Sequence, residues 1–226
     1  MRMLLAGTIS LGLAAMLAVA LFDIAERPVN LPAQLEQHID DAGVTHPITA
    51  VLLNFRAYDT LLEIGVLLVA ILVGMSLRPT SQGRLPARGI AEPSLLLPAL
   101  ARLLAPLMLL TGFYLLWAGS YYPGGAFQAG ALIAATGLLL RLAGVTAQPV
   151  PDSLWLRLPL AAGFLTFLLA GAAMLFTGRP FLTWPQDSAG SLIFAIELVL
   201  TVSIAATLLG LFLTTPSPRS RPGEDA

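Results

Sequence analysis

The chain has 226 residues, of which 57% are hydrophobic and 11% are charged, and its formal net charge is −1. Soluble domains carry about 25% charged residues, so this composition predicts an integral membrane protein and excludes a basic nucleic-acid-binding surface. The chain has no cysteine and two histidines, which excludes disulfides and thiolate chemistry and argues against a histidine-rich metal site. No cofactor is predicted.

Six apolar stretches are long enough to cross a bilayer, which takes about 20 helical residues. Backbone polar groups in lipid must be satisfied within their own segment, so the expected fold is all-α and polytopic. The stretches cover residues 3–22, 58–77, 95–118, 124–143, 155–176 and 191–213.

The distribution of arginine predicts the orientation, because the chain contains no lysine. With a cytoplasmic N-terminus, nine arginines fall on the cytoplasmic side and only Arg27 and Arg179 fall outside, with Arg56 at the start of the second stretch left out of the count. We therefore expect a multi-pass protein of the cell (inner) membrane with both termini in the cytoplasm.

The first stretch has two interpretations. Arg2, an apolar core and the small residues at 18–20 would also suit a cleavable signal peptide. An apolar run of about 20 residues is longer than the usual core of such a peptide. Small residues also recur every four positions from Ala6 to Ala18, which favours a retained, packed helix.

The second stretch carries Arg56, Asp59 and Glu63 near its start. An ionisable group in a span costs about 2.5 to 3.5 kcal/mol, so such groups usually have partners and a function. Their spacing of three and four residues predicts that they share one helix face. Alternatively, Arg56 and Asp59 form an interfacial pair that reaches water.

A segment rich in proline, glycine, serine and arginine at 78–94 predicts a cytoplasmic linker. It would separate a two-helix module at 1–77 from a four-helix domain at 95–213. The polar residues 214–226 predict a disordered tail.

The span at 124–143 opens with Pro123, Gly124 and Gly125, which permit either a sharp turn or an unwound helix start that lines a cavity. Gln128 enters the membrane with this span. Small residues at 126, 130 and 134 predict a face that another helix can approach closely.

The last span contains Glu197, and no basic residue lies between Asp187 and Pro218. A charged carboxylate without a partner is costly there, so we expect Glu197 to be largely protonated near neutral pH. It could then accept and release a proton where water reaches it. The alternative is a neutral acid that only hydrogen-bonds a neighbouring helix.

Two stretches resemble known sequences. PGGAFQAGALIAATGLLLRL is similar to the PGGGFQAG-type signature of the B subunit (MnhB-like) of Mrp-type (multiple resistance and pH) cation/proton antiporters. HPITAVLLNFRAYDTLLEIGVLLVAILV resembles the C-terminal helices of the Mrp A subunit and the small E-type subunit of membrane-bound hydrogenases. The chain thus resembles a fusion of an A-type tail with a B-type subunit.

The resemblance implies an accessory subunit of a sodium/proton or other monovalent cation/proton antiporter, with other membrane subunits as partners and no enzyme activity of its own. Asn54 stands where the A-type pattern often has aspartate, and Ala126 replaces a frequent glycine. The residues that match the A-type pattern are Arg56, Asp59, Thr60 and Glu63, and those that match the B-type signature are Pro123, Gly124, Gly125, Phe127, Gln128 and Gly130.

These observations combine into one hypothesis, in which protons or hydrated cations enter from outside through a cavity near the polar residues of the spans. The proposed path residues are Arg56, Asp59, Glu63, Gln128 and Glu197. Two alternatives are the membrane arm of a redox-linked pump, such as a membrane-bound hydrogenase or a formate hydrogenlyase-like complex, and a purely structural scaffold.

Overall fold

The computed structural model describes residues 2–22, 30–77, 96–146 and 154–214, and within these ranges the chain forms helices and loops without a strand. The all-α prediction is therefore confirmed for this part of the chain. Residues 1–36 and 37–226 form two compact units. The predicted linker at 78–94 and nearly all of the predicted tail lie outside the described residues.

The first unit contains α1 (Arg2–Phe22) and the start of α2 (Leu31–His38). Leucine, alanine and methionine dominate α1, and these residues have high helix propensity. Asn30 caps α2, because its side-chain Oδ1 accepts a hydrogen bond from the backbone N–H of Ala33 at 3.3 Å.

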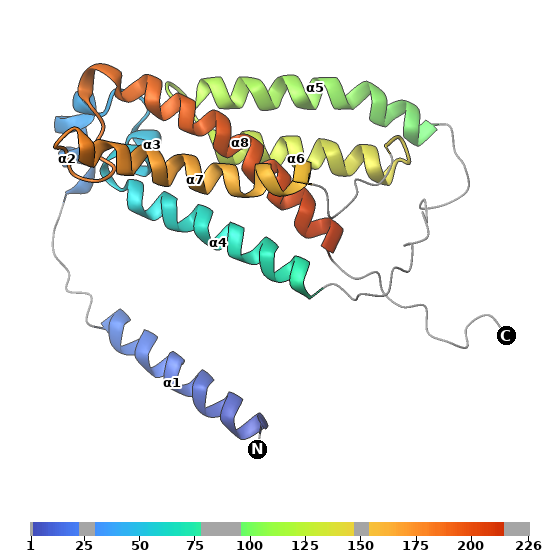
Figure 1. Ribbon diagram of the computed structural model, residues 1–226, viewed down its shortest axis with the longest axis horizontal. Coiled ribbons are helices and arrows are strands. Elements are labelled where there is room, and N and C mark those ends of the chain that lie inside the picture. The colour runs from blue at the N-terminus through green and yellow to red at the C-terminus, as the bar shows by residue number, and fades with distance from the viewer. Residues whose placement is uncertain (1, 23–29, 78–95, 147–153, 215–226) are drawn as a thin grey trace. The chain divides into compact units, whose positions relative to one another are not determined.

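The second unit is built on five apolar helices, coloured from cyan to red in Figure 1. Among the described residues, α4, α5, α7 and α8 are long and apolar enough to cross a membrane. The 17 residues of α6 make it shorter. The helices are α4 (Ala57–Ser76), α5 (Leu96–Ala118), α6 (Ala126–Leu142), α7 (Leu154–Phe176) and α8 (Ala189–Thr214), and their ends lie within two residues of the predicted spans.

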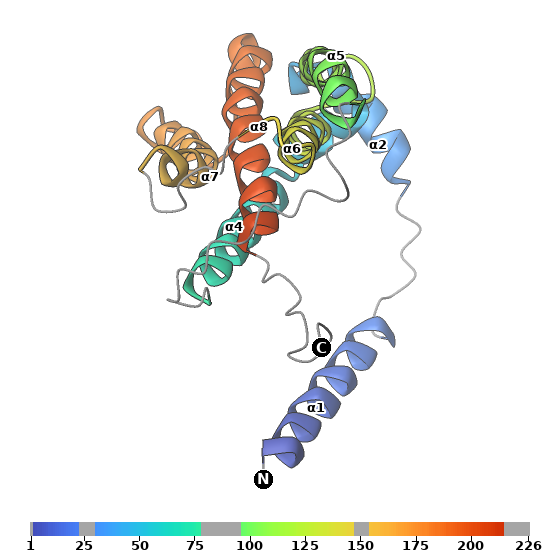
Figure 2. The ribbon, with the colours of Figure 1, turned by 90° about the vertical axis from the view of Figure 1, so that its right-hand side faces the viewer.

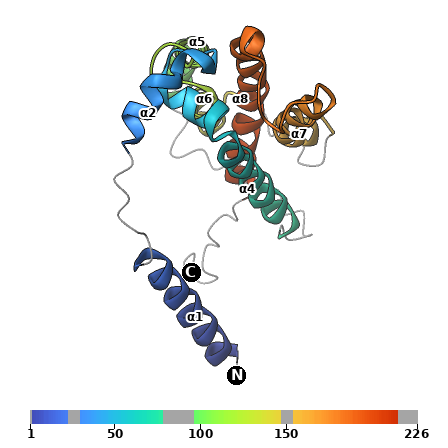
Figure 3. The same ribbon diagram turned by 90° about the vertical axis from the view of Figure 1, so that its left-hand side faces the viewer.

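Helix α8 is the centre of this unit and contacts α4, α6 and α7, while α5 packs on α6 (Figures 2 and 3). The predicted small-residue face of α6 is the face that meets α8. A Cβ atom added to Gly130 would lie 2.9 Å from Ile204 on α8, so only glycine allows this approach. In these contacts α4 belongs with the C-terminal helices, since it packs on both α7 and α8.

Short elements before α4 occupy a region that the sequence predicted as an exterior loop and a helix start. They are η1 (Ile39–Ala42), α3 (Pro47–Ala50) and the π-helix η2 (Val51–Phe55). The backbone breaks at Arg56, where φ is −127° and ψ is 37°, and α4 begins at the next residue. The run from 48 to 77 is therefore two helical pieces that meet at Arg56.

The connection between α7 and α8 folds over the end of the unit. Leu182 and Trp184 from this connection are only 3% and 4% exposed. The ring of Trp184 stacks on that of Phe167 in α7, with a centroid separation of 6.4 Å. The connection is therefore packed against α7 through two buried side chains.

Candidate functional site

Glu197 is a carboxylic acid in the interior of the helix group. It lies on α8, and its residue is 3% exposed. Oε1 accepts a hydrogen bond from the backbone N–H of Ala126 at 3.2 Å. Oε2 is buried and has no hydrogen-bond partner among the described residues. A buried polar atom without a partner is rare in proteins, so this oxygen is a candidate for water, a proton or a cation.

The partner of Glu197 is the first residue of α6. Helix starts leave N–H groups without an intrahelical acceptor, and they carry partial positive charge. Gly125, which precedes α6, has φ 114° and ψ −174°, a conformation that side chains disfavour. A Cβ atom added to Gly125 would lie 2.8 Å from Oε1 of Glu197. Glycine is therefore needed here both for its backbone conformation and for room beside the carboxyl group.

A cavity of about 250 Å³ adjoins Glu197. This volume has room for several water molecules, and its lining mixes hydroxyl, amide and carboxyl groups with aliphatic side chains. The polar side chains that line it are Thr49, Thr60, Gln128 and Glu197, and its backbone wall includes Gly124 and Gly125.

Residues of the π-helix η2 form part of the cavity wall. Leu52 and Leu53 of η2 line the cavity, and their carbonyl groups lie beside the break at Arg56. The Thr60 hydroxyl donates to the Leu52 carbonyl at 2.6 Å, and the Trp184 indole N–H donates to the Leu53 carbonyl at 2.6 Å. Side chains thus supply hydrogen bonds where the helix is irregular, as buried backbone groups require. π-Helical turns occur often at functional sites.

A second group of hydrogen bonds holds the loop between α5 and α6. Backbone N–H groups of Thr45 and His46 both donate to the carbonyl of Ser120 at 3.1 Å. The Thr49 hydroxyl donates to the carbonyl of Gly119 at 2.5 Å. The Gly125 N–H donates to the carbonyl of Leu115 at 2.8 Å. The glycine turn that faces Glu197 is therefore fixed from both the α3 and the α5 sides.

The predicted acidic face of α4 lies outside this cavity. Arg56 and Asp59 form an ion pair, and their side chains are 70% and 42% exposed. Glu63 is exposed on α4, and none of the three lines the cavity. The ion pair agrees with the predicted interfacial pairing of Arg56 with Asp59.

The structure therefore divides the predicted residues into two groups. Gln128 and Glu197 line one cavity with Thr60, Gly124, Gly125 and Phe127. The ionisable side chains of α4 face outward from the unit. The sequence patterns predict neither Thr49 nor Trp184 as a site residue, although Thr49 lies in the stretch that resembles the A-type helices. No sequence pattern marks Trp184, because its partner is a backbone carbonyl 131 residues away.

These features define a polytopic, all-helical membrane protein with a buried carboxyl group at a helix start. Residues 96–214 match the family described as "Domain related to MnhB subunit of Na+/H+ antiporter", and this match covers more than half of the chain. The chain belongs to this MnhB-related family.

A relative and two solved structures are similar to most of the chain. The relative is "Uncharacterized protein MJ1307" of Methanocaldococcus jannaschii, with 32% identity over 182 residues, 73% of this chain and 69% of that protein. A chain of the archaeal respiratory complex "membrane-bound sulfane sulfur reductase (MBS)" is 26% identical, with a TM-score of 0.68 and coverage of 94% of this chain and 97% of that one.

The second structure is the Mrp complex from Dietzia sp. DQ12-45-1b. One of its chains is 23% identical, with a TM-score of 0.64, over 94% of this chain and 26% of that chain. At this identity the likeness concerns the fold. The same fold is thus one part of a much longer subunit in that complex. The family match makes this chain an MnhB-like protein, and chains of two multi-subunit membrane complexes share its fold.

Proposed function

We propose that this chain is an accessory subunit of a monovalent cation (sodium)/proton antiporter of the cell membrane, and that Glu197 carries protons within it. The family description, which names a subunit of a Na+/H+ antiporter, supports the antiporter. One observation supports the role of Glu197: a buried carboxyl oxygen without a partner, on a residue that lines a cavity with room for water.

The surroundings of Glu197 suit a group that changes its protonation state. Burial penalises the charged form, because the carboxylate loses its hydration. The N–H of Ala126 and the positive end of the α6 dipole favour the charged form. Gln128 and Thr60 offer further hydrogen-bonding groups to water in the same cavity. Glu197 can therefore hold either state, and cavity water can carry the proton to and from it.

The test is cation/proton exchange in vesicles that contain the whole complex. Glu197→Gln keeps the shape and the hydrogen bond from Ala126 but cannot carry charge, so we expect exchange to fall by about tenfold or more. Glu197→Asp keeps the carboxyl group and should retain part of the activity. Asp187→Asn is the matched control, because Asp187 is an exposed acid just before α8.

The proposal depends on assembly being intact. Each variant complex is therefore purified and its subunit composition compared with the wild type before exchange is measured. Full exchange by an assembled Glu197→Gln complex would remove Glu197 from the path. A loss of subunits without a specific loss of exchange would favour a scaffold role.

Glu63 belongs to the proposal through a partner subunit. It is exposed on α4 between Leu62 and Val66, which are 66% and 68% exposed. A charged carboxylate facing lipid costs about 2.5 to 3.5 kcal/mol, so we propose that another subunit covers it and links it to the ion path. Glu63→Gln, alone and combined with Glu197→Gln, separates the two contributions in the same exchange assay.

A redox-linked membrane arm is the second candidate. The chain of the MBS respiratory complex matches this one over 97% of its own length, at a higher identity than the Mrp chain. Redox cofactors would then be held by other subunits. Purification of the native complex decides between the two candidates, since a redox arm would bring iron-containing subunits that an antiporter lacks.

A further inference from the structure

His46 contacts the wall of the Glu197 cavity through Thr49. It precedes Pro47, the first residue of α3, and its backbone is extended, with φ −80° and ψ 121°. Its Nδ1 lies 3.5 Å from Oγ1 of Thr49, three residues later. His46 is half-buried, whereas Thr49 is 4% exposed and lines the cavity. Histidine side chains gain and lose protons near neutral pH, so a group that can carry a proton borders the cavity.

Hydrogen bonds hold the backbone of His46 and the side chain of Thr49 in place. The His46 N–H donates to the carbonyl of Ser120 at 3.1 Å, in the turn before α6. The Thr49 hydroxyl donates to the carbonyl of Gly119 and keeps lone pairs that can accept a hydrogen bond. Nδ1 of His46 is therefore the donor towards Thr49, either in the neutral ring or in the imidazolium.

The cavity reaches the surface close to His46. Ile48 lines the cavity and is 60% exposed, and Gln128 lines it and is also exposed. The cavity has room for water, which can connect the Thr49 hydroxyl with the unpartnered Oε2 of Glu197. The side chains and the space for a proton path from the surface to Glu197 are thus present.

The titratable groups on the elements beside His46 are exposed. They are Asp40 and Asp41 of η1 and Tyr121 and Tyr122 of the turn between α5 and α6. Among the described residues, none of these groups forms an ion pair with His46. Water rather than a neighbouring carboxylate therefore exchanges protons with the imidazole.

We propose that His46 delivers protons from surface water to Glu197, by way of Thr49 and water in the cavity. This inference rests on the proposed proton role of Glu197. The step begins with Glu197 ionised and His46 as imidazolium. Nδ1 gives its proton to the Thr49 oxygen, as the Thr49 hydroxyl turns from Gly119 and gives its own proton to a cavity water. That water protonates Oε2 of Glu197, and His46 takes its next proton from the surface, so Thr49 and the water end as they began.

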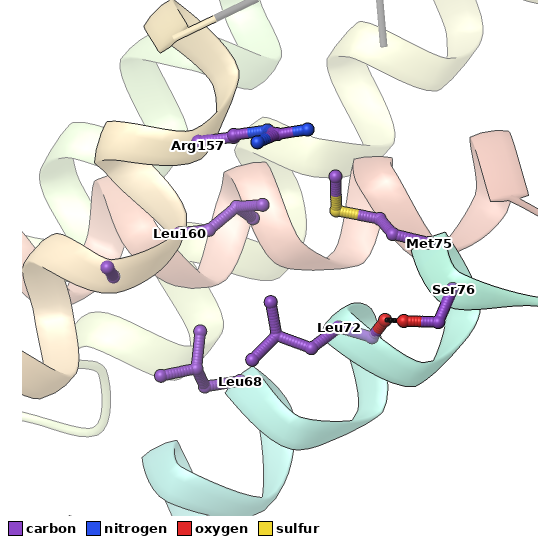
Figure 4. A pocket seen from close by; sticks show the side chains of 7 residues that line it. Leu68, Leu72, Met75, Ser76, Arg157 and Leu160 are labelled. Atoms are coloured by element: carbon purple, nitrogen blue, oxygen red, sulfur yellow. Dashed lines mark hydrogen bonds between the residues drawn. The ribbon is translucent and has the colours of Figure 1, made fainter. Parts of the chain in front are cut away.

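The groove between α4 and α7, of about 490 Å³, offers no such route. Figure 4 shows its aliphatic walls, which include Leu68 and Leu72 of α4 and Leu160 of α7. The polar side chains in its lining are Ser76 and Arg157, so none of the described residues that line it can receive a proton as a carboxylate does. The proton path is therefore assigned to the Glu197 cavity.

The test is cation/proton exchange in vesicles that contain the whole complex, with the subunit composition of each variant compared first. His46→Ala should lower exchange by about tenfold or more, because proton transfer by a positioned side chain contributes at least this much. Imidazole added to the buffer should restore exchange severalfold in this variant and leave the wild type unchanged. His38→Ala is the matched control, because His38 is the other histidine of the chain, is exposed on α2 and does not line the cavity. It should leave exchange unchanged, with or without imidazole.

A second variant, His46→Asn, separates proton transfer from support of the fold. The amide N–H of asparagine can donate to Thr49 as Nδ1 does but cannot carry a proton, so exchange should fall as far as in His46→Ala. Full exchange by an assembled His46→Asn complex would overturn the inference. So would a slow His46→Ala complex that imidazole does not restore, because His46 would then only support the structure.

The same assay keeps this inference apart from the proposed function. Imidazole should not restore exchange in Glu197→Gln, because the acceptor of the proton is then missing. Full exchange by Glu197→Gln would remove the proposed role of Glu197 itself. Full exchange by His46→Asn beside a slow Glu197→Gln would remove only His46, and surface water would then reach Glu197 without it.

Discussion

Gly125 and Glu197 constrain each other. The carboxyl group leaves no room for a side chain at position 125, and the glycine leaves the space that the carboxyl group occupies. The backbone of Gly125 brings the Ala126 N–H to the carboxyl group, and the missing side chain leaves space for Oε1. The second glycine of the PGG sequence thus has a direct structural reason. It permits a buried acid to bind the start of a neighbouring helix.

We expect Gly125→Ala to destabilise the complex by about 3 kcal/mol or more. The alanine backbone would have to adopt a conformation that favours glycine, and its Cβ atom would contact Glu197. Gly144→Ala is the matched control. Gly144 also has a positive φ, of 70°, but a Cβ atom there would meet nothing within 4 Å. It should cost only about 1 to 2 kcal/mol. Thermal unfolding of the two purified complexes measures the difference, and equal losses would mean that contact with Glu197 adds nothing.

The sequence identifies the unusual residues better than it identifies their neighbours. Glu197 and Gln128 could be singled out because polar groups in apolar spans are costly. Their common cavity could not be predicted, since it depends on the rotation of α6 and α8 about their axes. The same limit applies to Asp59 and Glu63, for which spacing gives a shared face but not the direction in which that face points.

The π-helix η2 contacts both the cavity, which Leu52 and Leu53 line, and the connection between α7 and α8, from which Trp184 donates to Leu53. A regular helix through residues 51–60 would bond each carbonyl to an N–H four residues later, whereas the Arg56 N–H donates to the carbonyl of Val51. This shift places the Leu52 and Leu53 carbonyls where Thr60 and Trp184 donate to them. Hydropathy alone cannot reveal the shift, because an apolar π-helix and an apolar α-helix have the same composition.

We expect Trp184→Phe to destabilise the complex by about 1 to 2 kcal/mol, because it leaves the buried Leu53 carbonyl without its donor. Stacking on Phe167 should largely persist, since phenylalanine keeps an aromatic ring. Trp117→Phe is the control, because Trp117 is 55% exposed on α5 and should change stability by less than about 0.5 kcal/mol. The unfolding temperatures of the two variants are compared, and equal values would contradict a bracing role for Trp184.

The predicted orientation of the whole chain places the Glu197 cavity near the outer side of the membrane. The turn between α5 and α6 carries exposed Tyr121 and Tyr122, and Trp117 is exposed one helical turn earlier. Such aromatic residues are enriched at membrane interfaces. The Glu197 cavity adjoins the same turn through Gly124 and Gly125. The arginine distribution predicts that this end of the helices faces outward, although aromatic residues mark both interfaces alike.

Single cysteines test this orientation, because the chain has none of its own. Tyr122→Cys places a thiol in the α5–α6 turn, and Thr146→Cys places one beyond the opposite end of α6; both positions are exposed. In intact cells, a membrane-impermeant maleimide should label this chain at 122 and leave 146 unlabelled. Permeabilised cells should label both, which controls for burial by other subunits. The reverse pattern would place the Glu197 cavity near the cytoplasm, so protons would reach it from the cytoplasmic side.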